Sequence, residues 1–179
     1  MTGSPIVLAR ATREGLQRAD SFITHPENLV YRNKSLGISF HRPPSWTVGA
    51  CDCSIGPYKA TVRVLSQEPP AGEGGMNSVS FATTTADAKT ARAAVIHSFG
   101  ADDPRAHSCM DSGMCATVTT SHATYNGVSF ERLDFGFYES GDTVLLTTTS
   151  RGTLVLDFGS VLEDDDPSIA LILGSLRIS

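Results

Sequence analysis

One short stretch, HSCMDSGMC at residues 107–115, gathers side chains that could bind a soft metal ion. The imidazole, thiol and thioether groups in it belong to His107, Cys109, Met110, Met114 and Cys115. Thiolate and thioether ligands suit Cu(I), so these five side chains could surround one ion. A metal site is therefore one of three interpretations of this loop.

The other two interpretations concern the cysteines. A Cys109–Cys115 disulfide could pinch the loop, because the residues between them include Asp, Ser and Gly, which turn readily. Alternatively, both thiols stay free. We favour the disulfide over free thiols, and free thiols over a metal. Cys51 and Cys53 are too close in sequence to bridge each other comfortably, so a second bond is expected to join this pair to the loop.

Enzyme signatures are missing from the sequence. It contains no G-x-S-x-G, no phosphate-cradling glycine loop and no H-E-x-x-H. The acidic run EDDD at 163–166 could offer oxygen ligands to calcium or magnesium. Its place before a predicted helix favours a solvated helix N-terminus instead. We expect a protein that is not an enzyme and carries no cofactor.

Composition and charge exclude further classes. A chain of 179 residues, 40% hydrophobic and 18% charged, fits one globular domain. A net charge of -5 with scattered basic residues argues against nucleic acid as a partner. No apolar run approaches the roughly 18 residues of a membrane span. The start, MTGSPIVLAR, has no basic region before its apolar run, so any targeting segment is expected to be absent from this chain.

Hydrophobic periodicity divides the chain into an arm and a domain. Residues 1–28 have no sustained period, which predicts a mobile or partner-bound N-terminal arm. The domain is expected to occupy 29–179. Alternation predicts strands at 36–40, 60–65 and 77–83.

The period then changes to that of a helix, at 84–100. Its apolar stripe consists of Ala88, Ala91, Val95 and Phe99. Thr84 with Asp87 resembles a capping box, and Gly100 is a natural C-terminal stop.

The second half begins with strands and ends with a helix. Strands are expected at 115–122, 128–139, 143–150 and 153–161. Leu133, Phe135 and Phe137 would share one face, and a tight turn at Arg151–Gly152 would join the last two strands. Asp166 as cap and Pro167 at the first helical position predict a second helix. A short extended segment at 175–178 follows. This order predicts an α+β fold with a central, mainly antiparallel sheet flanked by helices.

Three local features, in this order, resemble the PsbP-like family. YRNKSLGISFHRPPSW (31–46) is similar to the family opening, in which a strand with an aromatic residue runs into proline and then tryptophan. NSVSFAT (77–83) and the Ala-rich helix are similar to its second strand and first helix. YNGVSFERLDF (125–135), a hairpin and LGSLRI (173–178) are similar to its closing half. The resemblance covers about residues 30 to 178, but the four cysteines within that range are not part of the family pattern.

The resemblance implies an α/β/α sandwich and a non-catalytic binding role. The best-known members are extrinsic proteins of the photosystem II lumenal surface. We therefore expect an accessory or assembly protein that docks on a membrane complex, with the arm as docking element. Its compartment would be the thylakoid lumen or another extracytoplasmic space. The alternatives are a secreted or periplasmic protein that binds a soft metal or small molecule, and a cytosolic adaptor or chaperone.

Overall fold

The computed structural model describes residues 29–66, 78–102, 116–137, 140–160, 162 and 166–179. The described chain divides into two compact units. The central unit comprises residues 45–162, and the terminal unit combines 29–44 with 166–178. The expected N-terminal arm and the loop at 107–115 lie outside the described residues.

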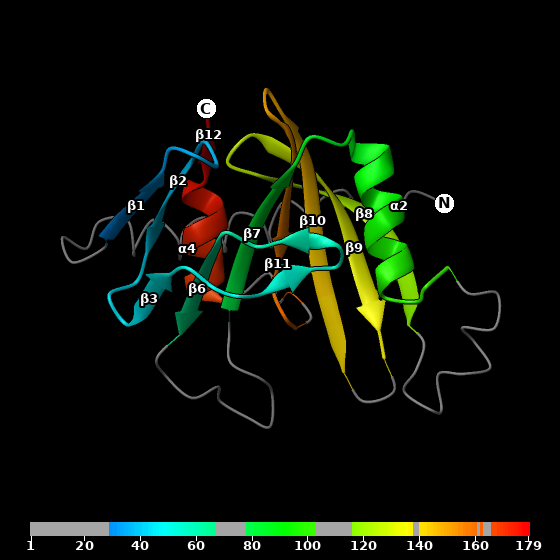
Figure 1. Ribbon diagram of the computed structural model, residues 1–179. Coiled ribbons are helices and arrows are strands. Elements are labelled where there is room, and N and C mark those ends of the chain that lie inside the picture. Colours follow the sequence, from blue (N-terminus) through cyan, green and yellow to red (C-terminus); the bar gives the residue numbers. More distant parts are fainter. Residues whose placement is uncertain (1–28, 67–77, 103–115, 138–139, 161, 163–165) are drawn as a thin grey trace, which may run out of the picture. The chain divides into compact units, whose positions relative to one another are not determined.

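The central unit is built on an antiparallel sheet of seven strands, in the order β3-β6-β7-β11-β10-β9-β8 (Figure 1). These strands are β3 (Trp46–Gly49), β6 (Val62–Ser66), β7 (Ser78–Thr84), β11 (Gly152–Asp157), β10 (Gly141–Thr149), β9 (Val128–Gly136) and β8 (Thr117–Tyr125). The strands expected from alternation are all present. β3 was not expected, because it follows two prolines and is only four residues long.

A two-residue turn joins β10 to β11. Thr149 pairs with Gly152, so the turn consists of Ser150 and Arg151. The expected turn at Arg151–Gly152 was thus placed one residue too far along the chain. Gly152 already belongs to β11, with a positive φ of 119° that favours glycine. A Cβ there would also collide with the backbone of Thr84.

Helix α2 (Ala88–Ser98) packs on one face of this sheet, against β10 and β11 (Figure 1). Its N-cap is Asp87, whose carboxylate accepts a hydrogen bond from the Thr90 N–H at 2.7 Å. That backbone hydrogen bond is the main reason why the pKa of Asp87 is lowered. The expected cap, Thr84, still belongs to β7, where it pairs with Thr153. The capping box was therefore wrong: the chain is not helical until three residues later.

The helix ends as expected. Gly100 has a φ of 69°, its N–H donates to the His97 carbonyl, and the Ala101 N–H donates to that of Ile96. These bonds form a Schellman motif.

A small hairpin covers the same face of the sheet. Strands β4 (Ser54–Ile55) and β5 (Tyr58–Lys59) pair with each other and contact β7. Its tip reaches α2: a Cβ on Gly56 would collide with the hydroxyl of Ser98. The sequence did not predict this hairpin, because two-residue strands show no period.

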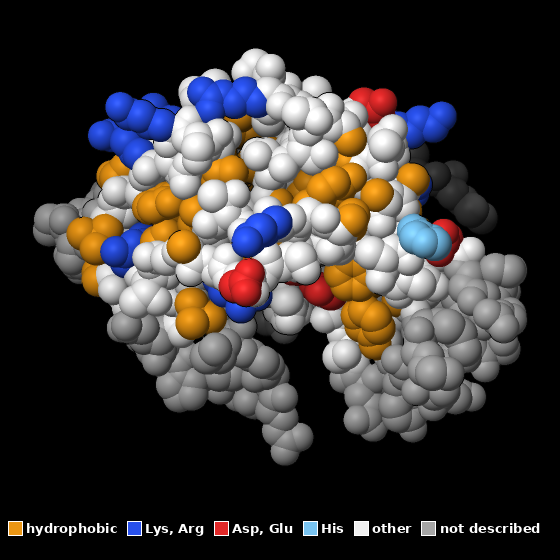
Figure 2. Space-filling model, in the orientation of Figure 1, with side chains coloured by type: hydrophobic (Ala, Val, Ile, Leu, Met, Phe, Trp, Pro, Cys, Tyr) orange, Lys and Arg blue, Asp and Glu red, His pale blue; other side chains and the backbone are white. Residues whose placement is uncertain are grey.

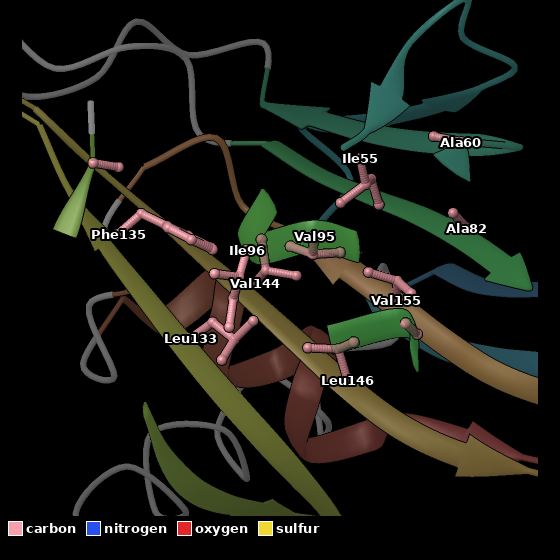
Figure 3. Packing of buried hydrophobic residues seen from close by; sticks show 12 residues of the cluster. Ile55, Ala60, Ala82, Val95, Ile96, Leu133, Phe135, Val144, Leu146 and Val155 are labelled. Carbon is pink, nitrogen blue, oxygen red and sulfur yellow. The ribbon is translucent and has the colours of Figure 1, made fainter. Parts of the chain in front are cut away.

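The core of the central unit lies between the sheet, α2 and the hairpin. Figure 3 shows side chains of α2 and of the sheet pointing toward one another. The fully buried side chains of this cluster are those of Ile55, Ala82, Ala91, Val95, Ala116, Leu133, Val144 and Val155. The helix contributes Ile96 as well, which the expected stripe did not include. Phe99 of that stripe packs against the cluster from a half-buried position.

The terminal unit combines the two ends of the described chain. Strands β1 (Leu29–Asn33), β2 (Ile38–Arg42) and β12 (Arg177–Ile178) form an antiparallel sheet with β2 in the middle. Helix α4 (Pro167–Ser175) packs on β2. Asp166 caps this helix by accepting hydrogen bonds from the N–H groups of Ser168 and Ile169, and Pro167 occupies the first helical position. The predicted helix start is confirmed.

Candidate functional site

Four polar side chains cross the sheet of the central unit on the face that carries α2. In register, Arg63 of β6 pairs with Ser80 of β7, and Ser80 pairs with Asp157 of β11. Asp157 is opposite Val144 of β10, so Asp142, two residues earlier in β10, lies on the same face. We call Arg63, Ser80, Asp157 and Asp142 the polar row.

Hydrogen bonds fix most of the polar row. The Arg63 Nε donates to the Ser80 hydroxyl at 3.1 Å. The Gly159 N–H donates to Asp157 Oδ1 at 2.9 Å. Asp142 differs, because its Oδ1 is buried and has no hydrogen-bond partner among the described residues. A buried carboxyl oxygen without a hydrogen bond is energetically costly, and far more so when the group is charged.

The two carboxyl groups interact directly. The pKa of Asp142 is raised to about 8, first by burial and then by the charge of Asp157 and a hydrogen bond with its carboxyl group. Backbone hydrogen bonds from Thr143 and Gly159 act in the opposite direction but are weaker. At pH 7 Asp142 is therefore mostly protonated. A protonated Asp142 can donate a hydrogen bond, which an ionised carboxylate cannot.

Aromatic side chains adjoin the acidic end of the polar row. Phe135 of β9 pairs with Asp142 in register. The Phe99 ring stacks on the Phe135 ring, with the two centroids 4.2 Å apart. The Phe137 ring lies 6.1 Å from that of Phe99. Figure 2 shows acidic atoms next to hydrophobic side chains on this face. Phe135 is thus the direct neighbour of Asp142 across the strand pair, and burial is the largest cause of the raised pKa of Asp142.

A disulfide lies at the other side of the row. Cys51 and Cys53 are bonded to each other. The expectation that they are too close to bridge comfortably, and would instead be joined to the loop at 107–115, was therefore wrong. The chain bends at Asp52, which brings the two Cα atoms to 5.2 Å, inside the range that disulfides need. A fully extended chain would hold these two Cα atoms about 6.6–7.2 Å apart, so the bend brings them closer together. The Cys53 sulfur lies 3.9 Å from the Ser80 hydroxyl.

The remaining candidate site residues from the sequence analysis do not form a described site. His107, Cys109, Met110, Met114 and Cys115 lie outside the described residues, so the metal site and the Cys109–Cys115 disulfide stay predictions. Of the acidic run at 163–166, the described Asp166 serves as a helix cap. In the described part of the chain, no three His, Cys, Asp or Glu side chains are grouped as a metal site would require.

The sequence analysis missed the polar row. Asp142 and Asp157 stand at the outer ends of β10 and β11, and a two-residue turn between these strands places them diagonally on one face. That signal was available from the sequence. The contribution of Ser80 and Arg63 was not, because it depends on pairing with strands distant along the chain.

A search of solved structures gives a match over most of the chain. The solution structure of cyanobacterial PsbP (CyanoP) from Synechocystis sp. PCC 6803 superposes with a TM-score of 0.52. The match covers 88% of this chain and 95% of that one, at 15% sequence identity. The chain has a PsbP-like fold.

The other comparisons add little to the PsbP-like fold. A crystal structure from Bacteroides thetaiotaomicron VPI-5482 matches 86% of this chain and 49% of its own, at 13% identity and a TM-score of 0.42. That score is too low to support an argument. No protein-family model matches the sequence, and no curated protein does. The fold expected from the resemblance is thus confirmed as an α+β, mainly antiparallel, PsbP-like fold.

Proposed function

We propose that this protein is a non-catalytic accessory or assembly factor that docks on a membrane-bound protein complex, and that the complex is a photosystem. The observation that carries the proposal is the fold. The match to CyanoP spans nearly the whole of both chains, so it is a likeness of complete architectures.

The N-terminal arm and the strand that follows it are the proposed docking element. The arm (1–28) leads directly into β1, which is an edge strand of the terminal sheet. Leu29 and Val30 of β1 are 45% and 49% exposed, and they are the large hydrophobic residues exposed in the described part of the chain. Exposed apolar residues on a free sheet edge are typical of a surface that a partner covers.

The proposed compartment is the thylakoid lumen or another extracytoplasmic space. The Cys51–Cys53 disulfide supports it, because disulfides form and persist in oxidising compartments and are rare in the cytosol. The structure contains no helix, in the ranges it describes, that is long and apolar enough to cross a membrane. Docking on a protein complex would place the chain at a membrane surface.

Co-sedimentation tests the proposal. Photosystem II particles stripped of their extrinsic proteins would be mixed with the purified chain and pelleted. We expect the chain to pellet at low salt, and to pellet at least tenfold less after Leu29→Ser and Val30→Ser. A matched control changes two exposed residues of the edge strand β8, Thr119→Ala and Ser121→Ala, and should pellet like the unmodified chain. A chain that stays in the supernatant with these particles would contradict the photosystem proposal.

A further inference from the structure

The Cys51–Cys53 disulfide lies at the base of the small hairpin and ties down the segment that enters it. Immediately beyond the bond, the Ala60 N–H donates to the Cys53 carbonyl at 2.9 Å and closes the hairpin. We call residues 51–60 the CxC hairpin. The disulfide thus fixes the bend from which the CxC hairpin starts.

The position of this disulfide is a poor one for global stabilisation. In the chain-entropy account, a disulfide stabilises a fold by closing a loop in the unfolded chain, and the effect is smallest for the shortest loops. The Cys51–Cys53 bond has a sequence separation of only 2. Its main effect is therefore on the local conformation around Asp52.

The two cysteines pack against the edge of the core cluster, and each sulfur has a polar neighbour. Each cysteine is half-buried, and between them the Asp52 side chain is fully exposed. The Cys51 sulfur lies 4.0 Å from the Ala60 carbonyl oxygen, and the Cys53 sulfur lies near the Ser80 hydroxyl. After reduction, each thiol would have an acceptor close by, so neither would be left buried without a partner.

The CxC hairpin also covers part of the core and of the sheet. Ile55 and Ala60 are buried in the core, and the tip at Gly56 abuts Val95 and Ser98 of α2. Under it run β7 and β11, the strands that carry Ser80 and Asp157 of the polar row. Loosening the CxC hairpin would therefore admit water to that part of the polar row.

We propose that Cys51–Cys53 is a reduction site for a protein dithiol, and that reduction releases the CxC hairpin from the sheet. The dithiol gives two electrons and two protons to the bond. The S–S bond breaks, Cys51 and Cys53 become thiols, and the donor leaves as a disulfide. The segment around Asp52 is then free to extend. This inference does not depend on the proposed docking function.

Hydrogen exchange combined with thiol mapping tests the proposal on the full chain, with dithiothreitol as the dithiol. Alkylation followed by peptide mass spectrometry reports Cys51 and Cys53 separately from Cys109 and Cys115. We expect Cys51 and Cys53 to become alkylated in the folded protein at a rate within tenfold of that in urea. Amides of residues 54–60 should then exchange at least tenfold faster, while those of α4 are unchanged.

The double substitution Cys51→Ser and Cys53→Ser should reproduce the fast exchange without reductant. Cysteines that resist alkylation until the chain unfolds would overturn the proposal. So would exchange of residues 54–60 that is equal in the oxidised and reduced proteins. The alkylation and hydrogen-exchange measurements are both made on the unmodified chain, so they test the proposal even if the double variant does not fold.

Discussion

Asp142 makes the stability of this protein depend on pH in an unusual direction. Its pKa is raised to about 8, whereas an aspartate in an unfolded chain titrates near about 4. Between these values the folded chain holds a proton that the unfolded chain has released. The free energy of unfolding should therefore fall as the pH rises through this window, by at most about 1.4 kcal/mol per pH unit.

Asp142→Asn tests this directly, because an amide cannot ionise. In this variant we expect the free energy of unfolding to fall much less between about pH 5 and 8. Relative to the unmodified protein, the variant should therefore be more stable at alkaline pH than at acidic pH. Urea unfolding at several pH values would measure it. Asp52→Asn changes a fully exposed carboxylate and should leave the decline in place. Parallel curves for Asp142→Asn and the unmodified protein would show that Asp142 does not hold the proton.

Phe135 is the residue whose truncation should damage the fold most. Its side chain is 1% exposed and stacks on Phe99, so its removal would leave a cavity that its neighbours cannot fill. Phe135→Ala should lower the free energy of unfolding by about 3–5 kcal/mol, measured by denaturant titration. Phe137→Ala, at a half-buried position further along the chain, should cost clearly less. An equal loss for both would mean that the stack contributes little.

Among the elements, the CxC hairpin depends on one glycine. Gly56 has a φ of +56°, and a Cβ there would strike Ser98 of α2. Gly56→Ala should destabilise the protein by more than the roughly 1–2 kcal/mol that a left-handed conformation costs an ordinary residue. Gly49→Ala is the matched control, because its Cβ would meet nothing within 4 Å. Thermal melts of both variants would decide, and similar melting temperatures would contradict the packing of the hairpin tip on α2.

Elements that carry their own local signal could be predicted from the sequence. The start of α4 followed from Asp166 and Pro167, and the β10–β11 hairpin from two alternating runs around a short turn. The start of α2 was misplaced because Thr84 and Asp87 are both good caps, and only the pairing of Thr84 with Thr153 decides between them. The β4–β5 hairpin had no period to detect. The Ser80 and Arg63 part of the polar row depends on the register of β7 with β11 and β6, which no local pattern determines.

For the whole molecule, the two segments around Cys51–Cys53 and Cys109–Cys115 are where the sequence departs most from the PsbP-like pattern, and the second of them lies in the loop expected at 107–115. Loops tolerate change without harm to a core, and they often carry partner contacts. Deleting residues 110–114 should therefore leave the melting temperature nearly unchanged while weakening sedimentation with photosystem particles. If the deletion unfolds the protein, or leaves sedimentation as it was, the loop is not an interaction site.

The terminal unit has a consequence for how the protein is made. Its contacts join the two ends of the described chain: the His41 N–H donates to the Ser175 hydroxyl across 134 residues, and Ile38 pairs with Ile178. A ribosome adding about 5–20 residues per second would release β2 many seconds before α4 and β12 exist. During that interval Ile38 and Phe40 lack the strand and helix that complete their unit, so the nascent chain offers an apolar strand to any chaperone nearby. Translation that stops before residue 167 would yield a chain in which this unit cannot form at all.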